Sequence, residues 1–312
     1  MLFIPFKVDI NLRSFPFLTI LISIACIVIY FQQVASNKAL EKSLVSFCHG
    51  QSTDSTFALV LEKIQGERSL SACAELIYTI FSSADAKQEI AAFTDKADRI
   101  DAFPADYSRR YINENLSEKY AVFEKFNRVR NLTALLMYSP DSYNVKNMIT
   151  AAFAHGSWSH VFGNLFFFFA FAAAVELALG FFTFILVFLA LAIGTHFAYS
   201  FSLFGVADAI PTLGLSGVVM GMMGMFAYLM PTVKIRCFWW FIIFVRIFRI
   251  PAWLLAGWYI GWDIYNLNHS DSQSNINFVA HISGAGIGFF MGLIFFRKRK
   301  AEIKRDIVAH RV

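Results

Sequence analysis

Six runs of mainly apolar residues, each long enough to cross a lipid bilayer, constrain this 312-residue chain more than any other feature. A helix needs roughly 20 such residues to span the hydrocarbon core. The chain has 57% hydrophobic residues and a mean hydropathy of +0.54, which excludes an ordinary soluble domain. The predicted spans are Phe15–Phe31, His160–Leu179, Phe181–Phe201, Gly214–Met230, Ile250–Leu267 and Phe278–Phe296. We therefore predict an all-α polytopic membrane protein.

Short basic segments give the orientation of these spans. Lys7 and Arg13 precede the first span, and Arg297–Lys300 follow the last, whereas the loops Ser202–Leu213 and Asn268–Asn277 contain no Lys or Arg. By the positive-inside rule both termini are cytoplasmic, so the net charge of +5 reports topology and gives no reason to expect nucleic-acid binding. We expect an integral multi-pass protein of a bacterial inner (plasma) membrane.

Two shorter features need an interpretation of their own. The run Cys237–Phe248 is apolar but short and is bounded by basic residues, so we interpret it as an interfacial segment and not a span. Val34-Ala35-Ser36 resembles a signal-peptide cleavage site, but the preceding apolar run is long for a signal peptide.

The polar segment between the first two spans is predicted to be an extracytoplasmic α-helical insert. Apolar residues three and four apart indicate helices over Thr56–Ile64, Ser69–Phe81, Ala84–Ile100 and Ser108–Met137, and Ser139-Pro140 would end the last of them. Asp54 and Ser69 are candidate helix caps. Cys48 and Cys73 both lie here, and the sequence leaves open whether they form a disulfide or remain two buried thiols.

These observations predict five parts of the chain. They are a cytoplasmic N-terminus (1–14), transmembrane helix 1 (15–31), the extracytoplasmic insert (32–147), a core with transmembrane helices 2 to 6 (148–296) and a basic cytoplasmic tail (297–312).

A serine and a histidine at membrane depth are the candidate reactive residues, because such polar groups are costly in lipid. The predicted topology sends spans two, four and six from outside to inside. His160 and Asn164 near the start of span two, Ser216 near the start of span four and His281 near the start of span six would then converge in the outer part of the membrane. Nucleophilic catalysis inside the bilayer requires such a meeting of serine and histidine.

Glycine spacing supports a close approach of spans four and six. Span four contains Gly217, Gly221 and Gly224, and span six contains Gly284, Gly288 and Gly292. Small residues at four-residue spacing let helix backbones approach closely, although such strips also occur where helices only pack.

Three motifs in order resemble the rhomboid family of intramembrane serine proteases. They are His155, His160 and Asn164; Gly214-Leu215-Ser216-Gly217; and Ala280-His281 followed by Gly284 and Gly288. Glu176 and Gly180 also resemble the family pattern. The resemblance covers roughly residues 148–296, leaves the insert outside, and implies a rhomboid-like six-helix bundle.

The resemblance implies a Ser216–His281 dyad that needs no metal or other cofactor. Ser216 would attack the scissile carbonyl, and its backbone N–H would stabilise the oxyanion together with the side chains of His160 and Asn164. His155, Gly214, Gly217 and Met220 would support the site. The implied partners are transmembrane protein substrates and the lipid bilayer. For the insert, which lies outside the resemblance, we predict a regulatory role or the recruitment of a further partner.

The chain departs from the family pattern at two places. Lys146 and Asn147 stand where a Trp-Arg pair is common, and Met220 stands where a tyrosine often stacks on the catalytic histidine. Asp263 is interpreted as an interfacial polar residue without a role in a triad, and His196 as a packing residue.

Other protein classes fit the sequence less well. A metalloprotease would need His-Glu-x-x-His, and an aspartyl protease would need paired aspartates within the spans. A transporter or channel would be expected to carry more charge along its spans. A catalytically inactive relative that binds transmembrane clients is the remaining alternative.

We also expect the loop Asn268–Asn277 to act as a mobile lid.

Overall fold

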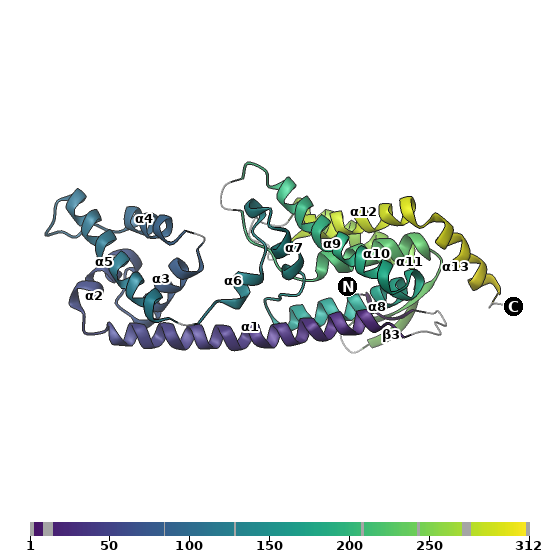
Figure 1. Cartoon of the computed structure of the whole chain (residues 1–312), viewed down its shortest axis with the longest axis horizontal. Helices are drawn as coiled ribbons and strands as arrows, with labels where there is room; N and C mark the ends of the chain where they lie inside the picture. The colour runs from purple at the N-terminus through teal and green to yellow at the C-terminus, as the bar shows by residue number, and fades with distance from the viewer. Residues whose placement is uncertain are drawn as a thin grey trace. The chain divides into compact units, whose positions relative to one another are not determined.

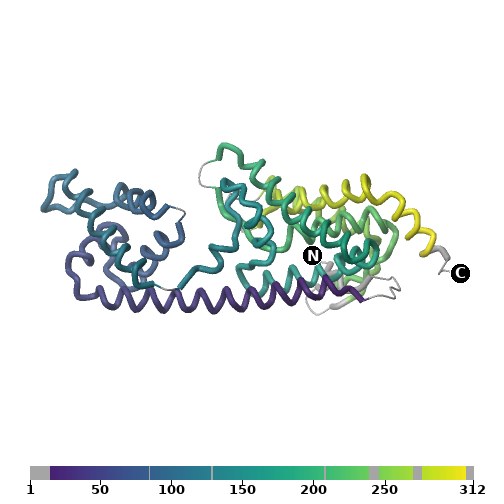
Figure 2. Tube along the Cα trace, viewed as in Figure 1, coloured from purple at the N-terminus to yellow at the C-terminus, as the bar shows by residue number. Residues whose placement is uncertain are grey.

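The computed structural model describes residues 3–8, 15–83, 85–127, 129–206, 209–241, 244–269 and 276–309. Its contacts divide the chain into two compact units. The core unit comprises residues 1–31 and 136–312, and the insert unit comprises residues 32–135. Helix α1, Phe17–Gly50, begins in the core unit and continues into the insert unit as one unbroken helix (Figures 1 and 2).

The insert unit is a small helical domain, as the sequence predicts. After α1 it contains α2 (Ser55–Gln65), α3 (Leu70–Ser82), α4 (Ala86–Lys96), α5 (Ala105–Phe126) and the start of α6 (Leu132–Leu136). Its interior is built from apolar side chains that are almost fully buried, among them Leu76, Ile77, Ile80, Leu116 and Phe123. These residues recur at helical spacing in α3 and α5, so burial of one apolar stripe per helix accounts for the fold.

Caps and a disulfide fix the ends of these helices. The carboxylate of Asp54 accepts hydrogen bonds from the backbone N–H groups of Thr56 and Phe57, at 2.9 and 3.0 Å, and Ser69 caps α3 in the same manner. Both predicted caps are therefore confirmed. A disulfide joins Cys48 on α1 to Cys73 on α3, which decides between the two states that the sequence left open.

Two helix boundaries differ from the sequence prediction. The segment Ser108–Met137, predicted as one helix, forms α5 and the separate short helix α6, because the side chain of Asn127 bonds to the backbone of Val129 and ends α5. The predicted helix Ala84–Ile100 is confined to Ala86–Lys96, after the N-cap Asp85.

The insert unit ends at Leu135, earlier than the boundary that was predicted after Asn147. Helix α6 ends at Leu136 and is followed by a 3-10 turn at Pro140–Ser142 and by α7, Val145–Ala151. Tyr138 is fully buried and exchanges two backbone hydrogen bonds with Thr212, at 2.9 and 2.8 Å. This pairing between distant segments has no periodic signature in the sequence.

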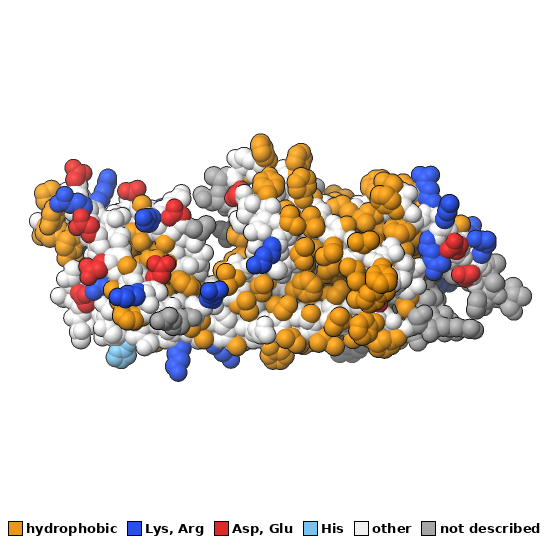
Figure 3. All heavy atoms as spheres, viewed as in Figure 1, with side chains coloured by type: hydrophobic (Ala, Val, Ile, Leu, Met, Phe, Trp, Pro, Cys, Tyr) orange, Lys and Arg blue, Asp and Glu red, His pale blue; other side chains and the backbone are white. Residues whose placement is uncertain are grey.

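The core unit is built on five helices that follow α7. They are α8 (Trp158–Leu179), α9 (Phe181–Ser202), α10 (Ser216–Leu229), α11 (Ala252–His269) and α12 (Phe278–Phe295). Hydrophobic side chains cover much of the visible face of this unit, whereas charged side chains gather on the insert unit and on α13, Arg297–Ala309 (Figure 3).

Four described helices are long and apolar enough to span a membrane: α1, α8, α9 and α12. Helix α10 has only 14 residues, or about 21 Å at the α-helical rise. Every residue of α10 from Gly217 to Leu229 is buried, so this short helix lies at the centre of the core unit. The chain is an all-α membrane protein, and the count of six spans stays a prediction.

Glycines bring α10 and α12 into direct backbone contact, as their spacing predicts. A Cβ atom at Gly224 would collide with the backbone carbonyl of Ala285, and one at Gly284 or Gly288 would collide with the carbonyl of Gly217 or Gly221. No side chain larger than hydrogen fits at these crossings, so the two helices that carry Ser216 and His281 are held at close range.

A small antiparallel sheet was not predicted. It contains β1 (Phe3–Val8), β2 (Lys234–Phe241) and β3 (Phe244–Pro251) in the order β1-β2-β3. The segment Cys237–Phe248, interpreted as interfacial, thus forms most of a hairpin. Ile235 and Cys237 are fully buried while Lys234 is exposed, so this part of β2 shows the alternation of a strand with one covered face.

Candidate active site

Ser216 is the first residue of α10, so its hydroxyl and its backbone N–H lie at the N-terminus of a helix. The first N–H groups of a helix have no acceptor within it, and the helix dipole makes this end favourable for negative charge. The preceding loop is fixed by a hydrogen bond of 2.8 Å from the backbone N–H of Gly214 to the carbonyl of Ala151. The serine is therefore presented where a developing anion would be stabilised.

Gly214 is required by both its conformation and its neighbour. Its φ of +123° lies in a region that residues with a side chain rarely adopt. A Cβ atom there would stand 2.8 Å from two ring atoms of His160. The glycine thus lets the loop before Ser216 lie directly against this imidazole.

His160 and Asn164 lie one turn apart at the start of α8. Ser157 caps this helix by accepting a hydrogen bond of 3.1 Å from the backbone N–H of His160. Asn164 is only 9% exposed, and its Nδ2 has no hydrogen-bond partner among the described residues. A buried amide donor without an acceptor is unfavourable by about 1–3 kcal/mol, so its retention needs a reason.

His155 lies behind these residues, just before α8. Its Nδ1 is 3.2 Å from the carbonyl of Phe153, and its ring stands edge-on to His160 with the centroids 5.1 Å apart. Burial and, to a smaller extent, the neighbouring His160 lower the pKa of His155 to about 4. A neutral, buried imidazole in this place supports the position of His160.

His281 lies in the first turn of α12. Asn277 caps this helix by accepting from the backbone N–H of Ala280 at 2.9 Å, and its Nδ2 donates to Thr212 Oγ1 at 3.2 Å, which ties α12 to the loop before Ser216. The ring of Phe278 stands edge-on to the imidazole, with the centroids 6.4 Å apart.

The interpretation of Asp263 as an interfacial residue is wrong. Asp263 is 9% exposed, and its Oδ2 lies 3.1 Å from His281 Nδ1. It comes from the second half of α11, whereas His281 comes from the start of α12. The sequence contained a signal, since the predicted topology places both residues at the outer ends of adjoining spans.

One cavity of about 190 Å³ brings the predicted reactive residues together. Ser216, His281, His160, Asn164, Gly214 and Gly217 all line it. Thr195 and His196 of α9 also line it, so His196 is part of the cavity wall as well as a packed residue with its Nδ1 2.7 Å from the carbonyl of Ala192. His155 and Met220 lie outside this lining, and Met220 is buried within α10.

The residues that replace the family's Trp-Arg pair lie in a short helix of the core unit. Lys146 and Asn147 lie in α7, where Asn147 Nδ2 donates to the carbonyl of Met137 at 2.9 Å. Residues 270–275 of the predicted lid Asn268–Asn277 lie outside the described residues.

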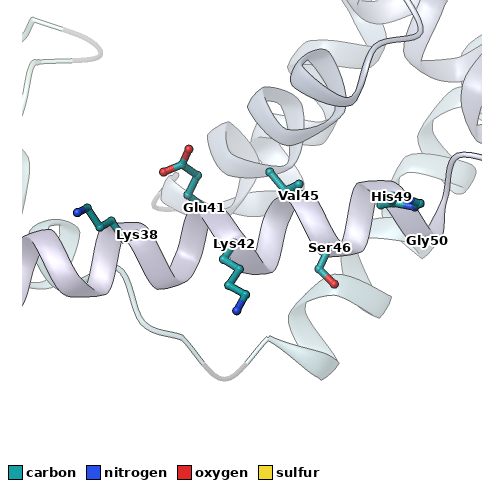
Figure 4. Close-up of a pocket in the computed structure, with 7 residues that line it drawn as sticks. All are labelled: Lys38, Glu41, Lys42, Val45, Ser46, His49 and Gly50. Carbon is teal, nitrogen blue, oxygen red and sulfur yellow. The ribbon is translucent and has the colours of Figure 1, made fainter.

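A larger hollow, of about 690 Å³, lies in the insert unit and lacks such convergence. Its lining residues all come from one face of a single stretch of α1, at the three- and four-residue spacing of a helix, and no other described element contributes to the lining (Figure 4). Within the described ranges no group of three or more His, Cys, Asp or Glu side chains is placed to hold a metal ion. The small cavity around Ser216 is therefore the candidate active site.

Comparison with known families agrees with this arrangement. The model of the rhomboid domain matches residues 143–298, which is half of the chain. The chain is a member of the rhomboid family. No curated protein matches it. The matched region of this rhomboid contains α8 to α12 and all the residues of the candidate site, whereas the insert unit lies outside it.

Proposed function

We propose that this rhomboid is an intramembrane serine endopeptidase that cleaves transmembrane or membrane-adjacent segments of other membrane proteins. The observation that carries the proposal is the lining of one cavity by a serine, a histidine and two further polar side chains, all contributed by apolar helices. Polar groups at such depth are unfavourable unless they serve a function.

Each of the four residues has a part in peptide-bond hydrolysis. Ser216 Oγ attacks the scissile carbonyl while His281 takes the hydroxyl proton, and His281 then gives that proton to the leaving amine. Water then attacks the acyl-enzyme while His281 takes its proton, and His281 gives that proton to Ser216 Oγ as the ester bond breaks. The oxyanion is stabilised by the backbone N–H of Ser216 and by the side chains of His160 and Asn164.

The amide of Asn164 supports this assignment. Its Nδ2 is buried, has no acceptor among the described residues and belongs to the same cavity as Ser216. An oxyanion that forms only during the reaction would give this donor the partner it lacks. The hydrogen bond from Asn164 then forms in the transition state but not in the resting enzyme, as catalysis requires.

The insert is proposed to lie outside the cytoplasm, with both termini of the chain inside. The Cys48–Cys73 disulfide supports this orientation, because disulfides persist in oxidising compartments. We further propose that the insert recruits substrates or a regulatory partner. Deleting 38–131 should then reduce cleavage of a native substrate more than cleavage of a generic one, whereas equal loss on both would indicate a purely structural role.

The primary test is cleavage of a single-span reporter protein by the purified enzyme in liposomes. The parent should cleave the reporter, and Ser216→Ala and His281→Ala should be inactive while they retain the thermal unfolding profile of the parent. A folded parent that never cleaves, or a Ser216→Ala variant that cleaves as well as the parent, would refute the proposal. A client-binding role without catalysis would then become the leading explanation.

A further inference from the structure

The carboxylate of Asp263 is largely buried, although α11 is otherwise rich in aromatic and apolar residues. Its side chain is 13% accessible, and that of His281 is 16% accessible. The flanking residues on α11 include Trp262 and Ile264, which are exposed on the apolar outside of the helix. A carboxylate in such a place requires a hydrogen-bonding partner, and among the described residues that partner is His281 Nδ1.

This contact determines which nitrogen of His281 can serve as the base. A neutral imidazole has one N–H donor and one lone pair on its two nitrogens. An ionised carboxylate only accepts hydrogen bonds, so the 3.1 Å contact requires the proton to be on Nδ1. The lone pair is then on Nε2, the nitrogen left for Ser216 in the cavity that both residues line.

We infer that Asp263 is a positioning residue that fixes the tautomer of His281 and stabilises its protonated form, so that this site operates as a Ser216–His281–Asp263 triad. The inference rests on the proposed protease function. When Ser216 attacks, its hydroxyl proton moves to Nε2 while the Nδ1–H bond to Asp263 is kept. The carboxylate stays ionised, and the proton on Nε2 passes to the leaving amine.

The other neighbours of His281 do not supply this function. Phe278 stands edge-on to the ring and offers no acceptor. Among the described residues, His160 on α8 and His196 on α9 are the other titratable groups that line the cavity, and neither can provide a negative charge. The residue in the place of the family's stacking tyrosine is Met220, which cannot hydrogen-bond as a phenol does. Asp263 is therefore the group that can orient the base.

The test compares Asp263→Asn, Asp263→Glu and the parent in liposomes over a range of pH. Asparagine has nearly the same shape but no charge, so kcat should fall by about tenfold or more. The acidic limb of the kcat/KM profile should move to lower pH by about one unit, because the imidazolium loses its counter-ion. Asp263→Glu keeps the charge and should restore part of the rate and the position of the limb. Asp141→Asn, an exposed carboxylate in the core unit, is the matched control.

A second measurement does not depend on any variant of Asp263. With isotope-labelled histidine, the parent should show a slowly exchanging, low-field Nδ1 proton that His281→Ala removes. Its absence from the folded parent would overturn the inference.

The outcomes separate this inference from the proposed function. If the parent cleaves and Ser216→Ala does not, but Asp263→Asn matches the parent in rate and pH profile, Asp263 has no positioning role and the protease function remains. If Asp263→Asn and Asp263→Glu lose equal activity with an unmoved acidic limb, the contact is only structural and the inference also fails. If the folded parent cleaves nothing, the proposed function and this inference both fail.

Discussion

The insert unit and the core unit are both helical, but they are stabilised in different ways. In the insert, each helix buries one apolar stripe, its ends are capped by side chains, and a disulfide links two of its helices. In the core, helices that are apolar on all sides come into contact through glycine, so that backbone meets backbone between α10 and α12. In water the hydrophobic effect drives apolar side chains into the interior. In lipid this driving force is absent, so close backbone contact and polar groups must determine how the helices pack.

The difference predicts that the largest effect will come from small substitutions at the helix crossing in the core. Gly288→Ala places a methyl group against the backbone carbonyl of Gly221, which cannot move without shifting α10. We expect a loss of about 3 kcal/mol in the free energy of unfolding together with loss of activity. Thermal unfolding in detergent measures this effect.

Gly286→Ala is the matched control, because it is on the same helix and its Cβ would meet no atom within 4 Å. It should be neutral or raise stability by up to about 1 kcal/mol, since alanine favours helix over glycine. Equal destabilisation by both variants would show that the crossing is not specific.

The disulfide should have the next largest effect, and only on the insert. It closes a sequence separation of 25 residues, for which loop-closure entropy gives a stabilisation of about 3 kcal/mol. The double variant Cys48→Ala, Cys73→Ala should lower the unfolding temperature of the insert and leave cleavage of a generic reporter unchanged. Scanning calorimetry of the full chain, with and without reductant, checks this. A matching fall in the transition of the core would contradict the division into two stabilising modes.

Gly214→Ala should reduce activity more strongly than stability. The new methyl group would press on the ring of His160 and displace it from the cavity. Displacement of a catalytic group by about 1 Å can reduce activity by about a hundredfold. We expect that loss in kcat together with a lower unfolding temperature, because alanine is strained at the φ of Gly214, whereas Gly156→Ala, whose Cβ has open space, should behave like the parent.

The smallest effect concerns the cap of α2. A hydrogen bond from Lys119, at 2.6 Å between Nζ and Oδ2, lowers the pKa of Asp54, and the backbone N–H of Phe57 adds to this. Because the folded pKa is depressed, the contribution to stability is present above the ordinary pKa near 4 and is lost as the pH falls through the folded pKa. Asp54→Asn should remove this dependence and shift the unfolding free energy by about 1 kcal/mol at most. Acid titration followed by circular dichroism would detect it, and a parent and variant with identical acid transitions would refute it.

Much of this molecule could be predicted from its sequence because the signals were local. The helices α2 and α3 followed from apolar spacing, and their caps followed from Asp54 and Ser69. The cavity residues could be grouped because polar side chains are rare in apolar spans and because the orientation of each span fixes which ends meet. The glycine spacing on α10 and α12 predicted their contact.

The errors came from features that depend on partners distant in the sequence. The bridge between Tyr138 and Thr212 joins segments with no shared pattern. The sheet was not predicted, because a short apolar run with flanking basic residues favoured an interfacial segment, although Ile235 and Cys237 alternate with Lys234 and Arg236. The predicted topology placed Asp263 and His281 at the same ends of adjoining spans, but their contact depends on which faces of α11 and α12 meet, and this has no signature in the sequence.

Helix α1 ends beyond its predicted span for a related reason. It continues to Gly50, and Leu40, Leu44 and Cys48 in its second half are buried in the insert. These residues are four apart and so lie on one face of the helix, and their burial stabilises the helix beyond the apolar run that predicted the span.

The length of α10 has a consequence for the chemistry. Its 14 residues cover about 21 Å, whereas a bilayer core is about 30 Å thick. Hydrolysis consumes one water molecule per bond cut, and lipid supplies none. In the proposed protease, a central helix shorter than the bilayer core would leave room beside Ser216 through which this second reactant could enter.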